Sequence, residues 1–195
     1  MEYKLKPITA ENDYIFIHPL RPTEVMRQEE VAEELLTIFS NPVVKQYSPD
    51  KYTTDKKLLS TQLFGVSEAY QQELGYTHYV TWKDTNEIIA QVEIITPKRA
   101  ETVYPKKGTW FLEYYLSEEY WGNGMMTDVI KTVVSHMSAQ GIQKIAAVCM
   151  PSNKASIRVL EKSGFKRTGP FDAKQDIYEL PRPGIGSWKL FSIFR

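Results

Sequence analysis

Two glycines separated by one residue lie where a strand pattern gives way to a helix pattern, in LSEEYWGNGMMT (residues 116–127). Glycine adopts backbone conformations that other residues resist, and the first turn of a helix leaves several amides unpaired and partially positive. Such a turn suits a pyrophosphate, so a phosphate-bearing cofactor is expected here. The plainer alternative is a turn that only joins a strand to a helix. The stretch lacks the patterns of a P-loop and of a dinucleotide fold, which disfavours nucleoside triphosphates and nicotinamide cofactors.

A second group of polar residues, Asn153, Ser156 and Arg158, follows one strand later and leads into EKSGF (residues 161–165). The segment TWFLEYYLSEEYWGNGMMTDVI, followed at the right distance by PSNKASIRVLEKSGFKRTG, resembles the acetyl-CoA-binding core of the GNAT superfamily of N-acetyltransferases. It is most similar to the branch that includes the ribosomal-protein N-terminal acetyltransferases. The resemblance covers residues 109–169, and the two motifs in this order are specific where either alone would not be.

The resemblance implies a fold, a cofactor and a set of binding residues. The fold would be α/β, with a mixed, mostly antiparallel sheet flanked by helices and an acetyl-CoA cleft between splayed central strands. Acetyl-CoA would be the co-substrate, and no metal is expected. The pyrophosphate would bind the amides of Trp121, Gly122, Asn123, Gly124, Met125, Met126 and Thr127. The backbone near Tyr115 and Leu116 would pair with the pantetheine arm like an added strand, with Asn153 and Ser156 beside that arm and the thioester.

The sequence departs from the general family motif at two positions of the glycine turn. Glu119 stands three residues before the first glycine, where Gln or Arg is favoured, and Met126 stands where a small residue is usual. Neither departure removes an amide that could bind phosphate. Local packing on the cofactor is therefore the property expected to differ.

Acetyl transfer to an amine requires a base for the amine and stabilisation of the departing thiolate. Glu113 is the first candidate base, because it lies in an aromatic strand beside the cofactor, where its proton affinity should be raised. The alternative is an exposed or salt-bridged strand residue. The related branch often carries a carboxylate two residues earlier, where this chain has Phe111. Glu93 on the neighbouring strand, or a chain of waters, is therefore the second candidate.

Ser156 and Tyr115 are the candidate acids for the leaving sulfur. Ser156 could instead only bond to the backbone of its own helix. Cys149 is expected to be a buried inert thiol, because that is far commoner than a nucleophile. His78 and His136 are expected to be structural or exposed.

Hydrophobic periodicity predicts the elements that position these residues. Strands are expected at 3–8, 13–20, 76–82, 88–95, 109–116, 142–150 and 165–169. Helices are expected at 24–39, at 54–74 with Thr54 as cap and an interruption at Gly65, at 122–140 and at 153–163. The later part of the chain has the order strand, helix, strand, helix, strand, which is typical of α/β proteins. The hairpins that precede it indicate that the sheet is mixed.

Composition narrows the class of protein. The 195 residues are expected to form one domain (1–195), with the cofactor core at 109–169 and a tail at 181–195, whose Trp188, Phe191 and Phe194 would close the sheet or make an oligomer contact. The formal charge is zero, with 24 basic and 24 acidic residues spread along the chain, which disfavours nucleic acid and anionic lipid as partners. The absence of a signal-like or membrane-spanning segment and the single cysteine indicate a cytoplasmic protein.

The sequence therefore predicts an N-acetyltransferase that transfers acetyl from acetyl-CoA to a primary amine of a small molecule, peptide or protein N-terminus by direct attack. The alternative from another class is an acetyl-CoA-binding or sensing module on the same fold, without transfer. No nucleic acid or membrane partner is expected, and a homodimer would be unsurprising.

Overall fold

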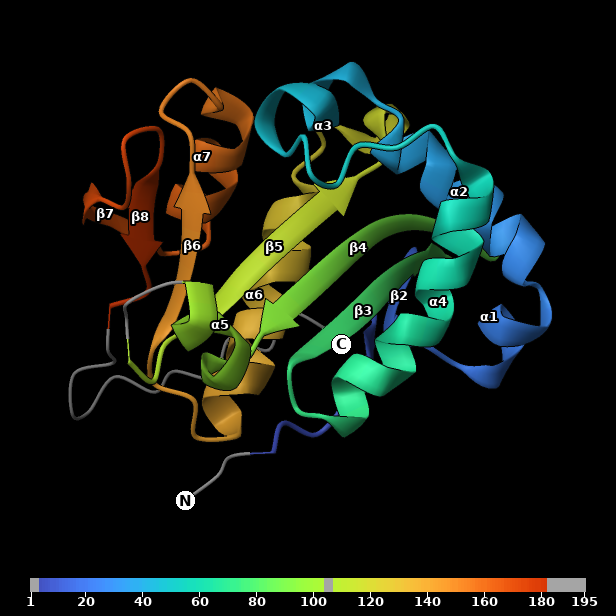
Figure 1. Ribbon diagram of the computed structural model, residues 1–195, viewed down its shortest axis with the longest axis horizontal. Coiled ribbons are helices and arrows are strands. Elements are labelled where there is room, and N and C mark those ends of the chain that lie inside the picture. The colour runs from blue at the N-terminus through green and yellow to red at the C-terminus, as the bar shows by residue number, and fades with distance from the viewer. Residues whose placement is uncertain (1–3, 104–106, 182–195) are drawn as a thin grey trace.

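The structure is a computed structural model that describes residues 4–103 and 107–181. Within them, eight strands form one sheet in the order β1-β2-β3-β4-β5-β6-β8-β7 (Figure 1). The strands are β1 (Ala10–Glu11), β2 (Ile15–Pro19), β3 (Gly75–Trp82), β4 (Glu87–Ile95), β5 (Trp110–Leu116), β6 (Ile145–Cys149), β7 (Lys166–Pro170) and β8 (Asp176–Glu179). The helices are α1 (Pro22–Met26), α2 (Gln28–Phe39), α3 (Pro42–Tyr47), α4 (Lys56–Gln71), α5 (Pro97–Val103), α6 (Met125–Ala139) and α7 (Lys154–Lys162), with the 3-10 turn η1 (Glu118–Tyr120).

The sheet is mixed and mostly antiparallel, as the sequence predicts. Strands β1 to β5 pair as an antiparallel series, β6 with β8 and β7 with β8 are also antiparallel, and β5 with β6 is parallel. The parallel pair lies in the middle of the sheet, where two antiparallel halves meet. The fold is therefore of the α/β class, with helices on both sheet faces.

Helices cover the two faces of the sheet differently (Figure 1). Helix α6 packs on one face through Val129, Ile130, Val133 and Met137, all less than 1% exposed, and the i, i+4, i+8 spacing of these positions gives the helix its apolar side. Helices α2 and α4 pack on the other face of β3 and β4, around a second core of Leu35, Phe39, Leu59, Leu63 and Tyr79. Burial of each large apolar side chain contributes about 1.5–3 kcal/mol.

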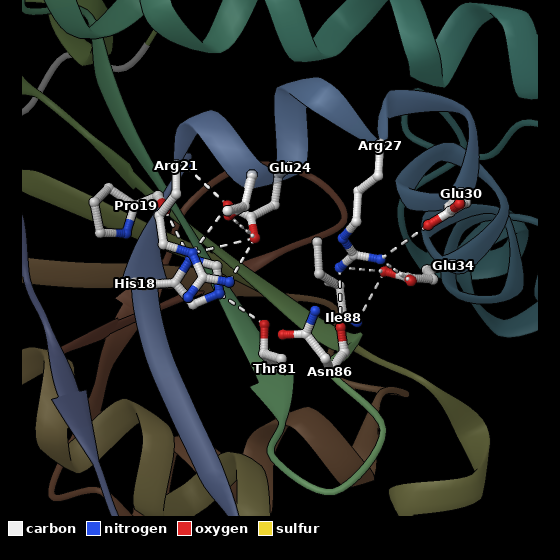
Figure 2. A network of polar contacts seen from close by, with 11 residues as sticks. His18, Pro19, Arg21, Glu24, Arg27, Glu30, Glu34, Thr81, Asn86 and Ile88 are labelled. Atoms are coloured by element: carbon white, nitrogen blue, oxygen red, sulfur yellow. Dashed lines mark hydrogen bonds and ion pairs between the residues drawn. The ribbon is translucent and has the colours of Figure 1, made fainter.

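A polar network fastens α1 and α2 to the β3–β4 hairpin (Figure 2). The Glu34 carboxylate accepts hydrogen bonds from the Ile88 N–H at 2.9 Å and from Arg27 Nη1 at 2.5 Å. Arg27 Nη2 also donates to the Asn86 carbonyl at 2.9 Å, in the turn between the two strands. Glu34 and Arg27 thereby bind the backbone of the β3–β4 hairpin, and these bonds orient β4 relative to the helices.

The network continues to the start of α1, where Glu24 is completely buried. Both oxygens of Glu24 accept hydrogen bonds from Arg21, through its backbone N–H and its guanidinium. Next to this pair, His18 contacts the Pro19 carbonyl through Nδ1 and the Thr81 hydroxyl through Nε2, each at 2.7 Å. Since a carbonyl only accepts, Nδ1 carries a proton. Burial lowers the pKa of His18, which favours the neutral ring.

Several predicted elements differ from the structure. The strand expected at 3–8 is wrong over 4–8, where the chain has no ladder. Leu5 and Ile8 are buried there instead, and the Ile8 N–H donates to His78 Nε2 at 3.0 Å. The helix expected at 24–39 is divided at Arg27 into α1 and α2. In α4, Asp55 rather than Thr54 accepts from the first amides, and Gly65 does not interrupt the helix.

Other differences concern elements that were not predicted. Helices α3 and α5 and strand β8 were missed, and β8 inserts between β6 and β7. Helix α6 begins at Met125 rather than at Gly122. The prediction for Trp188, Phe191 and Phe194 lies outside the described residues, as does Tyr3.

Candidate active site

Strands β5 and β6 separate soon after they meet. They pair only at Trp110 with Ile145 and at Phe111 with Ala146, whereas β5 stays paired with β4 as far as Leu116. From Leu112 onward, the edge of β5 that faces β6 therefore has no partner in β6. An unpaired strand edge can take an extended ligand as an added strand, and this divergence is the splayed cleft that the sequence predicts.

The glycine turn stands at the end of β5, immediately before α6. Gly122 and Gly124 have φ of 81° and 80°, a left-handed conformation that disfavours other residues. A Cβ added at either glycine would meet nothing within 4 Å, so the space above the turn is open. The first helical bond runs from Asp128 N–H to the Gly124 carbonyl. Among the described residues, the amides of 122–127 have no acceptor, and together they form an anion-binding surface.

Side chains around the turn explain how it is held in place. Trp121 is 40% exposed, and its indole N–H donates to the Leu116 carbonyl at 2.9 Å. The backbone predicted to receive the pantetheine arm therefore already accepts one bond at Leu116. Met126 and Thr127 bury their side chains, and Met126 joins the main core, so only their main-chain groups face the turn. Asn123 is exposed and Met125 half-buried.

Two carboxylates face each other just beyond the point where β5 leaves β6. Glu93 of β4 and Glu113 of β5 are direct neighbours in the ladder. Lys51 Nζ lies between them, 3.1 Å from Glu93 Oε2 and 3.2 Å from Glu113 Oε2, and Arg99 forms a second ion pair with Glu93. Among the described residues, Glu113 Oε2 has no partner with hydrogen-bond geometry. Glu93 is thus paired on both oxygens, while Glu113 is held by Lys51 alone.

This asymmetry separates the proton affinities of the two carboxylates. Burial raises the pKa of Glu113, the Lys51 charge lowers it and the Glu93 charge raises it again, and the net pKa lies above the ordinary range. Burial also acts to raise the pKa of Glu93, but Lys51 and Arg99 outweigh it and the net pKa is lowered. Glu113 is therefore the better proton acceptor of the pair at neutral pH, and Glu93 is a fixed anion.

Tyr115 lies on the same face of β5 as Glu113. Its ring packs on Phe39 with 5.1 Å between centroids. Burial, and then the charge of Glu113, raises the pKa of the Tyr115 hydroxyl well above its ordinary value, so the hydroxyl stays protonated. It can donate a hydrogen bond but does not act as a base.

Ser156 lies on the opposite side of β5, and it contacts a residue that sequence reasoning missed. Its Oγ is 2.7 Å from the hydroxyl of Tyr114, which also donates to the Ser156 carbonyl at 3.1 Å. Asn153 begins α7 and accepts from the Ser156 N–H at 3.1 Å, so its side chain also acts as a helix cap. The Ser156 hydroxyl is held by β5 at the side where β5 and β6 diverge.

The thiol of Cys149, at the end of β6, is buried next to this pair. Burial raises the pKa of Cys149, which leaves it a weak nucleophile. Its nearest polar partners are the carbonyls of Met150 and Asn153, at 3.5 and 3.8 Å from Sγ.

A pocket of about 230 Å³ opens between α2, α4 and strands β3 and β4. One wall is polar and includes Asp50, Lys51, Glu93 and Arg99. The opposite wall, from α2 and α4, is mostly apolar and includes Leu35, Phe39, Leu59, Leu63, Val66 and Ala69, with Gln62 as a polar member. The carboxylate pair therefore stands at the edge of a concave space on the sheet face that α6 does not cover.

Lys51, Arg99 and Tyr114 are the site residues that sequence reasoning missed. Tyr114 alternates with Glu113 and Tyr115, and strand period alone places it on the other face, toward α7. Lys51 lies in a loop with no periodic pattern, and its carboxylate partners lie 42 and 62 positions later in the chain. No local signal connects them.

Comparison with known proteins decides the family. The sequence model of the family described as "Acetyltransferase (GNAT) domain" matches residues 20–166, more than half of the chain. The chain belongs to the GNAT acetyltransferase family. It is therefore an acetyl-CoA-dependent acetyltransferase, and the matched residues include the glycine turn, Glu93, Glu113 and Ser156.

Individual GNAT relatives are distant in sequence but similar in fold. The chain is 27% identical over 175 residues to YoaA of Bacillus subtilis (strain 168), an uncharacterized N-acetyltransferase, with 82% of this chain and 93% of YoaA covered. It is similar to the ribosomal-protein-S5-alanine acetyltransferase from Vibrio fischeri, with a TM-score of 0.71, 17% identity and coverage of 93% and 99% of the two chains. It is also similar to RimL, a ribosomal L7/L12 alpha-N-protein acetyltransferase solved with coenzyme A, with a TM-score of 0.65, 14% identity and coverage of 89% and 97%.

Over 4–103 and 107–181, no group of three or more His, Cys, Asp or Glu side chains is arranged to hold a metal ion. None of the helices in the same ranges has the length and apolar character needed to cross a bilayer.

Proposed function

We propose that the protein transfers the acetyl group of acetyl-CoA to a primary amine, with Glu113 as the general base. The observation that carries this proposal is a half-buried carboxylate with a raised pKa, located where β5 and β6 separate and beside a pocket. A base with a pKa moved toward neutrality takes a proton from an ammonium group more readily than an ordinary carboxylate does.

The residues of the cleft fit acetyl-CoA. The free amides of 122–127 suit its pyrophosphate, and the open edge of β5 suits its pantetheine arm. When bound, acetyl-CoA supplies a thioester carbonyl for the amine to attack and a thiolate as leaving group. Trp121, Gly122, Asn123, Gly124, Met125, Met126, Thr127 and Leu116 are proposed to contact it through main-chain atoms, with Asn153 beside the arm.

The protein's own residues then manage two protons. Glu113 accepts the proton of the acceptor ammonium, which frees the nitrogen lone pair. The Ser156 hydroxyl, held by Tyr114 at 2.7 Å, donates its proton to the departing sulfur and takes up the second proton that the attacking nitrogen releases, and Tyr115 is the alternative donor on the opposite face. Glu93 stays ionised and, with Lys51, fixes the position of Glu113.

Names of structural relatives support an amine as acceptor. Two of them are described as acetyltransferases of ribosomal proteins, one for an alanine of S5 and one for the alpha-N position of L7/L12, and another is an aminoglycoside acetyltransferase. All are under 25% identical to this chain, so they support the reaction class and leave the acceptor open between small molecules and N-termini.

The test measures CoA release and acetylated product with a panel of amines, for wild type and Glu113→Gln, together with acetyl-CoA binding by calorimetry. We expect turnover by wild type, a large loss in the variant and equal binding by both. Tight binding of acetyl-CoA with no transfer to any amine would instead support a sensing module and contradict the proposal.

A further inference from the structure

We infer that the acceptor is a small primary amine with one positive charge and an apolar body, bound in the pocket between α2, α4, β3 and β4. This inference rests on the proposed function and specifies its substrate class. It follows from the charge of one pocket wall, the chemistry of the other and the size of the space between them.

The polar wall and the adjacent Glu113 together have one uncompensated negative charge. The charges of the wall itself cancel, because Asp50 and Glu93 are negative and Lys51 and Arg99 are positive. Glu113 lies outside the lining but is ion-paired with Lys51, and when it is ionised the group has a net charge of minus one. Both cations are already ion-paired with the glutamates. A single ammonium on the ligand neutralises this net charge, whereas a carboxylate on the ligand would find no unpaired cation in the wall.

The wall from α2 and α4 has no opposite charge for a second charged group. It is formed mainly by Leu35, Phe39, Leu59, Leu63 and Val66, with Gln62 as an uncharged polar side chain, and Leu59 and Leu63 are almost fully buried. A charged group placed against the apolar side chains loses its hydration without gaining an ion pair, which is costly. The wall thus favours a monoamine over a diamine or an amino acid with a carbon chain of the same length.

The volume limits the size of the body. A space of about 230 Å³ lies below the range of about 300–1,000 Å³ typical of sites for drug-sized ligands. Small residues of α4 keep it open: Ala69 lines it, and Gly65 lines it with nothing within 4 Å of an added Cβ. The space fits an alkyl chain of a few carbons or one ring.

The test uses amines that share one chain and differ at its far end: n-pentylamine, 1,5-diaminopentane and 5-aminopentanoate, with methylamine as the short reference. Acetyl-CoA-dependent kcat/KM is measured for each, and thermal shift reports amine binding without turnover. We expect kcat/KM for n-pentylamine to exceed each of the other three by about tenfold or more.

Ala69→Leu is the pocket variant, and Ser67→Leu, at an exposed position of the same helix that does not line the pocket, is its matched control. Ala69→Leu should remove the advantage of n-pentylamine over methylamine and the thermal shift that n-pentylamine causes, while acetyl-CoA binding persists. Ser67→Leu should behave as wild type. If Ala69→Leu does not fold, Gly65→Leu replaces it. The kcat/KM values of wild type for the four amines test the substrate class without either variant.

The possible failures are distinguishable. Equal kcat/KM across the wild-type series, or a preference for 1,5-diaminopentane, 5-aminopentanoate or a peptide with an apolar first residue, overturns the inference and leaves amine acetylation in place. Binding of acetyl-CoA with no transfer to any amine overturns the proposed function, and thermal shifts then show separately whether the pocket binds n-pentylamine.

Discussion

Two groups of buried charges lie against the same sheet, and they are built differently. In the network of α1 and α2, both oxygens of Glu24 and of Glu34 accept hydrogen bonds, two of them from the backbone amides of Arg21 and Ile88 (Figure 2). Around Lys51, Glu93 is paired on both oxygens, but Glu113 has one ion pair and an oxygen without a hydrogen bond. Hydrogen bonds from Arg21 overcome burial and lower the pKa of Glu24, whereas burial prevails and raises the pKa of Glu113.

The difference indicates which group serves stability and which serves reactivity. A carboxylate that is fully hydrogen-bonded is fixed as an anion, and its removal exposes unpaired donors. A buried carboxylate with incomplete pairing keeps a proton affinity near the range that acid–base catalysis needs. The predictions below test this division.

The largest effect should come from the same substitution made in both groups. Glu113→Gln should lower kcat by about 10²- to 10⁴-fold, because the variant has no base, and should leave the unfolding free energy nearly unchanged. Glu34→Gln should lower the unfolding free energy by about 2 kcal/mol, because Arg27 loses its charged partner, with kcat of the folded protein retained. Steady-state kinetics and chemical denaturation check both. Equal effects of the two variants on both quantities would contradict the division.

The next largest effect should be a loss of unfolding free energy at low pH, caused by protonation of His78. Its Nε2 accepts from the Ile8 N–H, and burial lowers its pKa to about 4 from 6.5. The folded state therefore binds the proton less readily than the unfolded state, and stability present above pH 6.5 is lost as the pH falls toward 4. The loss is roughly 3 kcal/mol. Denaturation of wild type and His78→Gln across this window measures it, and an unchanged slope in the variant would exclude His78 as the cause.

Lys51→Met should change the pH dependence of activity. The Lys51 charge lowers the pKa of Glu113, so its removal raises that pKa further. Since activity requires ionised Glu113, the acid limb of kcat/KM should move to higher pH by about one unit or more. Lys51→Arg keeps the charge and should keep the limb in place. If the acid limb of kcat/KM lies at the same pH in Lys51→Met as in wild type, the role given to Lys51 is contradicted.

The smallest effect is expected at Gly65 of α4. A glycine inside a helix lowers stability relative to alanine, and an added Cβ here meets nothing within 4 Å. Gly65→Ala should therefore raise the unfolding free energy by about 0.5–1 kcal/mol. Thermal and chemical denaturation measure the gain. A lower unfolding free energy in the variant would show that the space around Gly65 does not accept a Cβ, which contradicts the prediction.

Hydrophobic periodicity in the sequence predicted the helices and strands that bury one face against the core. The apolar spacing of Val129, Ile130, Val133 and Met137 predicted α6, and the β-branched and aromatic runs predicted β3, β4 and β5, because these periods follow from packing on one face. The spacing of the two motifs predicted the glycine turn and the family. These features depend on residues close together in the chain.

Features that depend on distant partners could not be predicted in this way. Strand β8 is four residues long, and its place between β6 and β7 is set by pairing across the sheet. The break at Arg27 accompanies a bond from its guanidinium to Asn86, 59 positions away. The apolar and polar pattern of residues 3–8 predicted a strand, but Leu5 and Ile8 are buried without a ladder. The pairing of Lys51 with Glu113 needs the whole fold.

The most direct test of the account is thermal unfolding with and without acetyl-CoA, for wild type, Gly124→Glu and Asn123→Glu, with Ser135→Glu as control. Ser135 is exposed on α6, eleven positions after Gly124, so its variant adds the same charge away from the turn. Acetyl-CoA should raise the midpoint of wild type and Ser135→Glu, because a ligand of the folded state stabilises it. The rise should be lost in both turn variants. An equal rise in all four proteins would place the cofactor elsewhere, and no rise in wild type at millimolar acetyl-CoA would contradict the account.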